Sequence, residues 1–310
     1  MTRAETETPD SWAGRMTREF RPPAPAPPAR LRRILCTIDF SEASVAAVAE
    51  AVALAHTCRG EITLLFVIPY VAPSRVQGQE LPSGVSAAVT EDVEALLEPA
   101  RAAGIPVRVC LKAGRPAHEI LETARRTTPD VIVMGTHGRG GLKRWALGSV
   151  TDEVLRNAPC PVLAIRHRPS SEAPLTASAP SNTVVCGVSL SLSSPRTVAY
   201  ASEVARATGA RLVLLHVIDH RATIDVRRSS GRLHALAAAA GLSADRVEEV
   251  VVRGDPARQI LRTAASRGVR LVVVGGENGS PGPRIDSTLE RVIRGARCAV
   301  LTVRATPEGA

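Results

Sequence analysis

Hydrophobic residues fall into short continuous runs, and between these runs apolar and polar positions alternate with a helical period. In the first half of the chain the runs predict strands at 34–38, 62–68, 107–111, 131–134 and 162–165. The stretches between them predict helices at 42–56, 85–103, 117–126 and 151–157. Continuous apolar runs are typical of parallel strands that are buried on both faces. The pattern therefore predicts an α/β fold, a doubly wound five-stranded parallel sheet with helices on both faces.

The same pattern occurs twice along the chain. RILCTIDFS at Arg33 matches TVVCGVSLS at Thr183, and EITLLFVI at Glu61 matches RLVLLHVI at Arg211. Such an internal repeat predicts two tandem domains of one architecture, here called copy one and copy two. The expected organisation is a disordered Pro-rich tail at 1–31, copy one at 32–166, a linker at 167–182, copy two at 183–304 and a tail at 305–310.

A glycine-rich loop follows the strand predicted at 131–134 and leads into the next helix. Glycine lets the backbone approach a ligand closely, and the free N–H groups and dipole of a helix start attract an anion. Hydroxyl and guanidinium groups near the loop would add donors. The segment predicts a phosphate cradle built from Gly135, Gly138, Arg139, Gly148, Ser149 and Thr151. The alternative is a glycine-rich turn that only links strand to helix.

The spacing Gly135-x2-Gly138-x9-Gly148-Ser149 resembles the ATP-binding subgroup of the universal stress protein family. It is not a P-loop, because Lys143 is not followed by Ser or Thr, and no GxGxxG fingerprint occurs there. The resemblance covers both copies. It implies a strand order of 3-2-1-4-5, an ATP ligand with Mg²⁺ carried by its phosphates, and a regulatory or sensor role in stress response. It also implies that the two domains pair through their last strands, and it allows a homodimer.

Ligands of doubly wound sheets bind beyond the carboxyl ends of strands, where the strand order reverses. Asp39 ends the first strand and is expected to accept hydrogen bonds from a ribose; the alternative role is a cap for the next helix. The resemblance implies that main-chain atoms of Val67 pair with the adenine edge and that Met134 packs near the base or sugar. It assigns the adenosine to Thr37, Ile38 and Asp39, and the phosphates to Gly135, Gly138, Gly148, Ser149, Val150 and Thr151.

Copy two departs from this pattern. Ser189 stands at the position of Asp39, Asn278 replaces Gly138, and Asp286 replaces Gly148. Together with Glu277, Asp286 brings negative charge to a position that would hold phosphates, and like charges repel more strongly in a desolvated cleft. Copy two is therefore expected to be degenerate and to bind ATP weakly or not at all.

Composition narrows the remaining classes of function. The 310 residues carry a net charge of +9, but the basic residues are spread among acidic ones without a basic block, so a nucleic-acid partner is not expected. No apolar run reaches the length of a membrane span and the N-terminus lacks a signal peptide, so a cytoplasmic location is expected. Six scattered cysteines give no metal or redox motif.

Two other functions stay open at this point. One is an enzyme, but His137 and Asp152 are the only candidate bases near the loop, so at most slow ATP hydrolysis and no dedicated catalysis are expected. The other is an interaction scaffold that works without nucleotide and binds partners through the Pro-rich tail.

Overall fold

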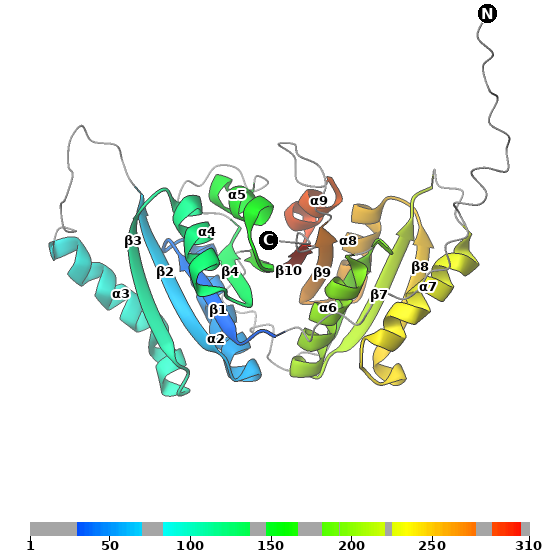
Figure 1. Cartoon of the computed structure of the whole chain (residues 1–310), viewed down its shortest axis with the longest axis horizontal. Coiled ribbons are helices and arrows are strands. Elements are labelled where there is room, and N and C mark those ends of the chain that lie inside the picture. Colours follow the sequence, from blue (N-terminus) through cyan, green and yellow to red (C-terminus); the bar gives the residue numbers. More distant parts are fainter. Residues whose placement is uncertain are drawn as a thin grey trace, which may run out of the picture.

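The computed structural model describes residues 30–69, 83–136, 147–166, 182–191, 193–220, 225–276 and 287–304. Two copies of one α/β unit lie side by side and meet near β10 at the centre of Figure 1. The elements of copy one are β1 (Arg33–Ile38), α2 (Glu42–Cys58), β2 (Glu61–Pro69), α3 (Ser83–Ala102), β3 (Val107–Gly114), α4 (Pro116–Thr127), β4 (Val131–Gly135), α5 (Ser149–Asn157) and β5 (Val162–Ile165). Those of copy two are β6 (Thr183–Val188), α6 (Ser194–Thr208), β7 (Arg211–Ile218), α7 (Val226–Ala239), the short 3₁₀-helix η1 (Ala244–Arg246), β8 (Val247–Arg253), α8 (Pro256–Ser266), β9 (Leu271–Gly276), α9 (Ser287–Gly295) and β10 (Ala299–Arg304).

The described strands form one continuous sheet in the order β3-β2-β1-β4-β5-β10-β9-β6-β7-β8. Within each copy the strands are parallel and follow the order 3-2-1-4-5, so the predicted fold class and strand order are confirmed. The two copies join where β5 and β10 pair antiparallel, with Leu163 opposite Leu301. This pairing satisfies backbone groups that would otherwise lie at two open sheet edges.

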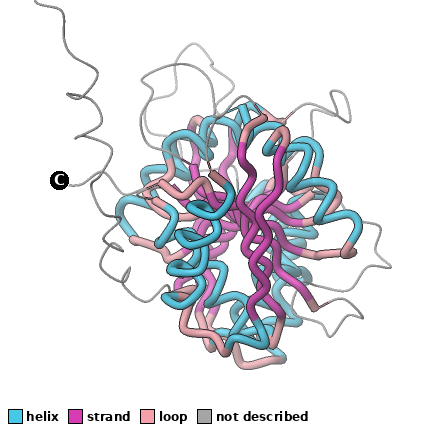
Figure 2. The backbone as a smooth tube through the Cα atoms, turned by 90° about the vertical axis from the view of Figure 1, so that its right-hand side faces the viewer, coloured by secondary structure: helices cyan, strands magenta, loops and turns pink. Residues whose placement is uncertain are grey.

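Helices cover both faces of the sheet, as the side view in Figure 2 shows. Side chains of α2, α3, α6 and α7 pack on one face, and those of α4, α5, α8 and α9 pack on the other. Each apolar layer runs across the β5–β10 junction, because buried residues of both copies belong to the same cluster. Burial of these aliphatic side chains, at about 25 cal/mol per Å² of apolar surface, holds the two copies together as well as each copy internally.

The predicted helices and strands of copy one are all present, with ends that differ by a few residues. Ser41 caps α2 as expected, since its Oγ accepts a hydrogen bond from the Ser44 amide at 3.3 Å. The expectation that every strand is buried on both faces is wrong for β3. It lies at the outer edge of the sheet and pairs only with β2, so Val109 keeps 43% of its surface exposed.

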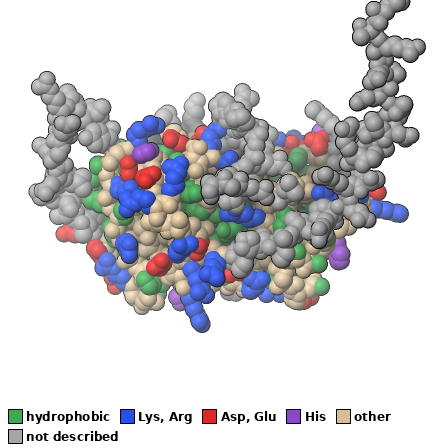
Figure 3. All heavy atoms as spheres, viewed as in Figure 1, with side chains coloured by type: hydrophobic (Ala, Val, Ile, Leu, Met, Phe, Trp, Pro, Cys, Tyr) green, Lys and Arg blue, Asp and Glu red, His purple; other side chains and the backbone are tan. Residues whose placement is uncertain are grey.

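One face of the molecule shows how charged side chains are distributed over the described residues. On the face shown in Figure 3, basic side chains of the described residues lie among acidic ones. Within the described part of the chain, no helix combines the length and the apolar character needed to cross a membrane.

Candidate functional site

The candidate site lies where β1 and β4 separate. Their pairing ends at Cys36 opposite Val133. Beyond this point β1 continues alongside β2 as far as Ile38, and β4 continues alongside β5 as far as Gly135. The two central strands therefore part at their carboxyl ends. This is the switch point at which doubly wound sheets bind ligands.

One wall of this crevice is the turn between β1 and α2. The Asp39 carboxylate accepts hydrogen bonds through Oδ1 from the Ser41 amide at 3.0 Å and from the Ser41 hydroxyl at 2.6 Å. The Asp39 amide donates to the Ser44 Oγ at 3.3 Å. Asp39 thus orders the turn, while Ser41 caps the helix. Asp39 Oδ2 makes no hydrogen bond to any described residue.

Phe40 occupies the turn with a backbone φ of 61°, in the left-handed region that non-glycine residues seldom adopt. Its ring packs edge-on against Phe66 of β2, with the ring centroids 5.2 Å apart. The chain has three phenylalanines, and two of them meet at this strand end. Sequence reasoning missed this pair, although the rarity of aromatic residues was a usable signal.

The opposite wall joins β4 to α5. Thr136, which follows β4, donates its amide to the Ile165 carbonyl at 2.9 Å and accepts from the Gly148 amide at 3.0 Å. The bond between Thr136 and Gly148 fixes the two ends of the intervening loop, so the start of α5 lies beside the end of β4. Thr136 is buried and was also missed, because its role depends on a pairing across the loop.

The N-terminus of α5 offers backbone donors. Gly148 is the N-cap and supplies no side chain, and the first helical bond runs from the Asp152 amide to the Gly148 carbonyl. The amides of Ser149, Val150 and Thr151 have no partner within the helix, as in the first turn of any helix. Such amides together with the helix dipole favour an anion.

The structure changes the role of one predicted residue. The buried hydroxyl of Thr151 donates its proton to the Gly135 carbonyl at 2.9 Å, so it is not free to donate to a phosphate. A phosphate role of Thr151 therefore rests on its amide. The hydroxyl instead ties α5 to the end of β4.

Gly135 has a packing role that the sequence did not show. A Cβ atom at this position would lie 2.9 Å from the backbone of Ala43 and Ser44 in α2. The absence of a side chain lets the first turn of α2 approach β4 closely. This contact brings the two walls of the crevice together.

The remaining predicted residues divide into two groups. Thr37, Ile38, Val67 and Met134 are buried residues. The last β1–β2 pair is Ile38 with Phe66, and Val67 lies one residue beyond it. Val67 pairs with β3, but no described residue of β1 pairs with it. Gly138, Arg139 and the candidate base His137 lie outside the described residues, as do Glu277, Asn278 and Asp286 of copy two.

The equivalent strand end in copy two is filled by basic side chains of the chain itself. His216 stands at the position of Phe66 and places Nδ1 2.8 Å from the Val188 carbonyl. Arg232 of α7 donates to the carbonyl of Leu190, the equivalent of Phe40, at 2.5 Å. Ser189, Ser191 and Ser193 form a chain of hydroxyl contacts of 2.9 Å in place of the Asp39 turn.

Two further observations bound the chemistry. Among the described residues, no three His, Cys, Asp or Glu side chains come together as metal ligands. A cleft of about 510 Å³ lies among described residues at the opposite end of the sheet, next to the amino ends of β1, β2 and β3, and is therefore separate from this crevice.

Comparison with known proteins identifies the family. The model of the universal stress protein family matches residues 30–166 and 180–304, which together make up most of the chain. The chain belongs to the universal stress protein family. It carries two such domains in tandem.

Individual relatives agree with this assignment. A universal stress protein of Methanocaldococcus jannaschii is 34% identical over 147 residues, which cover 46% of this chain and 85% of the relative. One of Thermus aquaticus is 37% identical over 139 residues, covering 44% and 98%. The crystal structure of a universal stress protein from Archaeoglobus fulgidus shares the fold, with a TM-score of 0.69 at 24% identity over 87% of this chain and 97% of that one.

The close contact at Gly135 predicts a selective loss of stability. Gly135→Ala is expected to lower the free energy of unfolding by roughly 1–3 kcal/mol, because the added methyl group meets backbone that has no room to move. The matched control is Gly231→Ala in the interior of α7, where a Cβ meets nothing within 4 Å and helix propensity predicts a small gain. Urea unfolding of both variants checks this, and equal effects would contradict it.

The buried imidazole of copy two predicts a pH effect. Burial lowers the pKa of His216 below its usual 6.5, and the positive charge of Arg232 lowers it further, although the hydrogen bond to the Val188 backbone raises it. The unfolded chain then binds more protons, so the stabilising contribution is complete above about pH 6.5 and is lost as the pH falls below it. Thermal unfolding between pH 7.5 and 5 should show a shallower pH dependence in His216→Phe, and an unchanged slope would refute this assignment.

Proposed function

We propose that this protein is an ATP-binding universal stress protein of the cytoplasm, which acts as a regulatory or sensor protein in stress response. Copy one would hold the nucleotide at the crevice between β1 and β4. The observation that carries the proposal is the first turn of α5, whose amides have no partner within the helix and whose N-cap Gly148 has no side chain, at the point where the two central strands part. Membership of the family supports the same ligand class.

The residue roles follow the walls of the crevice. The adenine edge would pair with main-chain atoms at Val67, and the adenosine would lie along Thr37 and Ile38 next to Met134. Asp39 would accept a ribose hydroxyl through Oδ2. The phosphates would be held by main-chain amides at the start of α5 together with the loop residues, namely Gly135, Gly138, Arg139, Gly148, Ser149, Val150 and Thr151. Mg²⁺, when present, would be bound by the phosphate oxygens, because Mg²⁺ prefers oxygen ligands.

Copy two would bind ATP weakly or not at all. Its strand end is covered by His216 and by Arg232, whose hydrogen bond to the Leu190 carbonyl would have to break before a ligand could enter. Breaking a hydrogen bond that involves a charged group costs about 1.5–3 kcal/mol. Copy two would serve instead as the permanent partner of copy one through the β5–β10 pairing. A homodimer would then need another surface.

Catalysis is not part of this proposal beyond slow hydrolysis at most. Asp152, at the start of α5, is bound by Arg156 through two hydrogen bonds of 3.0 Å, so its carboxylate is already engaged. Positioning of an attacking water by a free base is what efficient phosphoryl transfer requires. Ligand binding would act by stabilising the folded state through mass action, which a sensor can exploit.

A substitution that copies a residue of copy two into copy one tests the nucleotide site. Gly148→Asp places at the α5 N-cap the residue that copy two carries there, Asp286. Asp is a favoured N-cap, so the helix is retained while a negative charge faces the phosphates. ATP affinity measured by calorimetry should fall at least tenfold. Gly148→Ser, also a favoured N-cap but uncharged, should keep affinity within about threefold of the original.

The alternative of a nucleotide-independent scaffold predicts a different result. The unmodified protein would then give no titration heat with ATP and release no nucleotide on denaturation, and neither Gly148 variant would differ from it. If the original protein and the Gly148→Asp variant bind ATP with equal affinity, the nucleotide binds elsewhere on the chain.

A further inference from the structure

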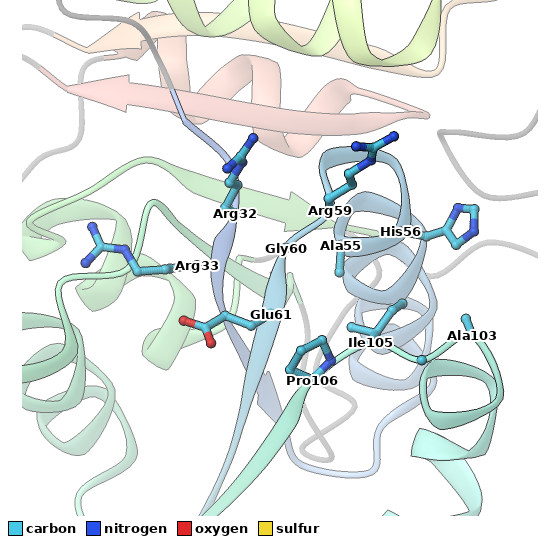
Figure 4. Close-up of a pocket in the computed structure, with 11 residues that line it drawn as sticks. Arg32, Arg33, Ala55, His56, Arg59, Gly60, Glu61, Ala103, Ile105 and Pro106 are labelled. Carbon is cyan, nitrogen blue, oxygen red and sulfur yellow. The ribbon is translucent and has the colours of Figure 1, made fainter.

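The cleft at the amino ends of β1, β2 and β3, here called the amino-end cleft, is a second pocket on copy one. It encloses about 510 Å³, enough for a small organic molecule. Its lining combines the apolar residues Ala55, Ala103, Ile105 and Pro106 with the basic residues Arg32, Arg33, His56 and Arg59 and the acidic Glu61. Figure 4 shows the side chains of Arg32, just ahead of β1, and Arg59, at the end of α2, extending in the same direction.

Two of these cations have no partner in the described part of the chain. Among the described residues, neither the Arg32 nor the Arg59 guanidinium takes part in an ion pair or a hydrogen bond. Arg33 differs, because it bonds the Asp130 carboxylate at 3.1 Å and turns away from Arg32 and Arg59 (Figure 4). The amino-end cleft therefore offers two guanidinium groups to a ligand, and such groups bind phosphate and carboxylate in a bidentate manner.

Arg59 occupies a position that its backbone does not favour. It ends α2 with φ at 50° and ψ at 50°, a left-handed C-cap conformation that normally selects glycine. Copy two has Gly209 at the equivalent position. Among the described residues of copy one, Thr128 is the other non-glycine residue that ends a helix in the left-handed conformation. Its hydroxyl accepts a hydrogen bond from Arg33 at 3.0 Å, so its side chain has a structural role. The helix dipole favours a basic residue at this end of α2, whereas the left-handed backbone at position 59 favours glycine.

The same corner of copy two is closed by a side chain of the chain itself. Arg246, just ahead of β8, donates to the carbonyls of Ala205 at 2.8 Å and Ala210 at 2.7 Å. These alanines are the equivalents of Ala55 and Gly60, which line the amino-end cleft. Pro106 stands ahead of β3 where Arg246 stands ahead of β8, as the strand registers show. The cleft is thus open in copy one because the filling arginine is replaced by proline.

We propose that the amino-end cleft binds a small organic anion, a phosphate or carboxylate that carries an apolar body. Arg32 and Arg59 hold the anionic group, and Ala103, Ile105 and Pro106 contact the apolar part. The site lies at the opposite end of the sheet from the nucleotide crevice, so it gives copy one a second ligand that is independent of ATP.

Residue-resolved NMR of the full-length protein tests this site. Phenyl phosphate and benzoate are titrated separately at constant ionic strength, and the amide signals of Gly60 and Ile105 are followed. Saturable shifts with either compound support the proposal and identify the anionic group preferred. Arg59→Gly, which places glycine in a conformation it favours, should weaken binding at least tenfold without lowering the melting temperature.

Three further variants separate the cleft from other sites. Pro106→Arg reproduces Arg246 of copy two and should abolish the shifts by filling the cleft. Arg262→Ala removes an exposed arginine of α8 that lies outside the cleft and should leave them unchanged, as should Gly148→Asp at the nucleotide crevice. The proposal is overturned if neither compound gives saturable shifts at Gly60 and Ile105, or if Arg59→Gly binds as the original protein does.

Discussion

Hydrogen bonding between β1 and β4 stops at Cys36 and Val133, and the candidate nucleotide site exists because it stops there. Each strand goes on pairing with its outer neighbour, so the sheet stays intact while its centre opens. Gly135 lets the start of α2 approach the end of β4, and the bond between Thr136 and Gly148 sets α5 beside it. The first turn of α5 and the ordered carboxylate of Asp39 lie on the two walls of this opening.

The two copies share one fold but differ in the side chains that lie at the two ends of their strands. At the carboxyl end, copy one has the Phe40–Phe66 pair, whereas copy two has His216 and Arg232 bound to strand-end carbonyls. At the amino end, copy one has an open cleft, whereas copy two has Arg246 bound to two carbonyls. A guanidinium with backbone partners takes up space that a ligand would need. In the described part of copy two, an arginine bound to backbone carbonyls thus lies at each end of the sheet, while the β5–β10 pairing keeps the copy attached to copy one.

Much of the fold followed from the sequence because parallel strands and amphipathic helices leave strong periodic signals. The repeat and the strand positions could be predicted in this way, whereas the order 3-2-1-4-5 was implied by the resemblance to the universal stress protein family. The exposure of β3 could not, because an apolar run such as Val107–Leu111 does not show whether a strand is central or at an edge. Within the site, glycine spacing pointed to the loop, but not to the use of the Thr151 hydroxyl. That hydroxyl bonds a carbonyl sixteen residues away, and such partners are fixed by tertiary packing.

The most direct test of this account is photolabelling of the full-length protein with azido-ATP, followed by peptide mass mapping. We expect close to one label per chain, on peptides of copy one near the ends of β1, β2 or β4, and loss of the label when excess ATP competes. Label on copy two, or equal labelling of both copies, would contradict the claim that copy two binds ATP weakly or not at all. Absence of competed label would contradict the nucleotide site itself.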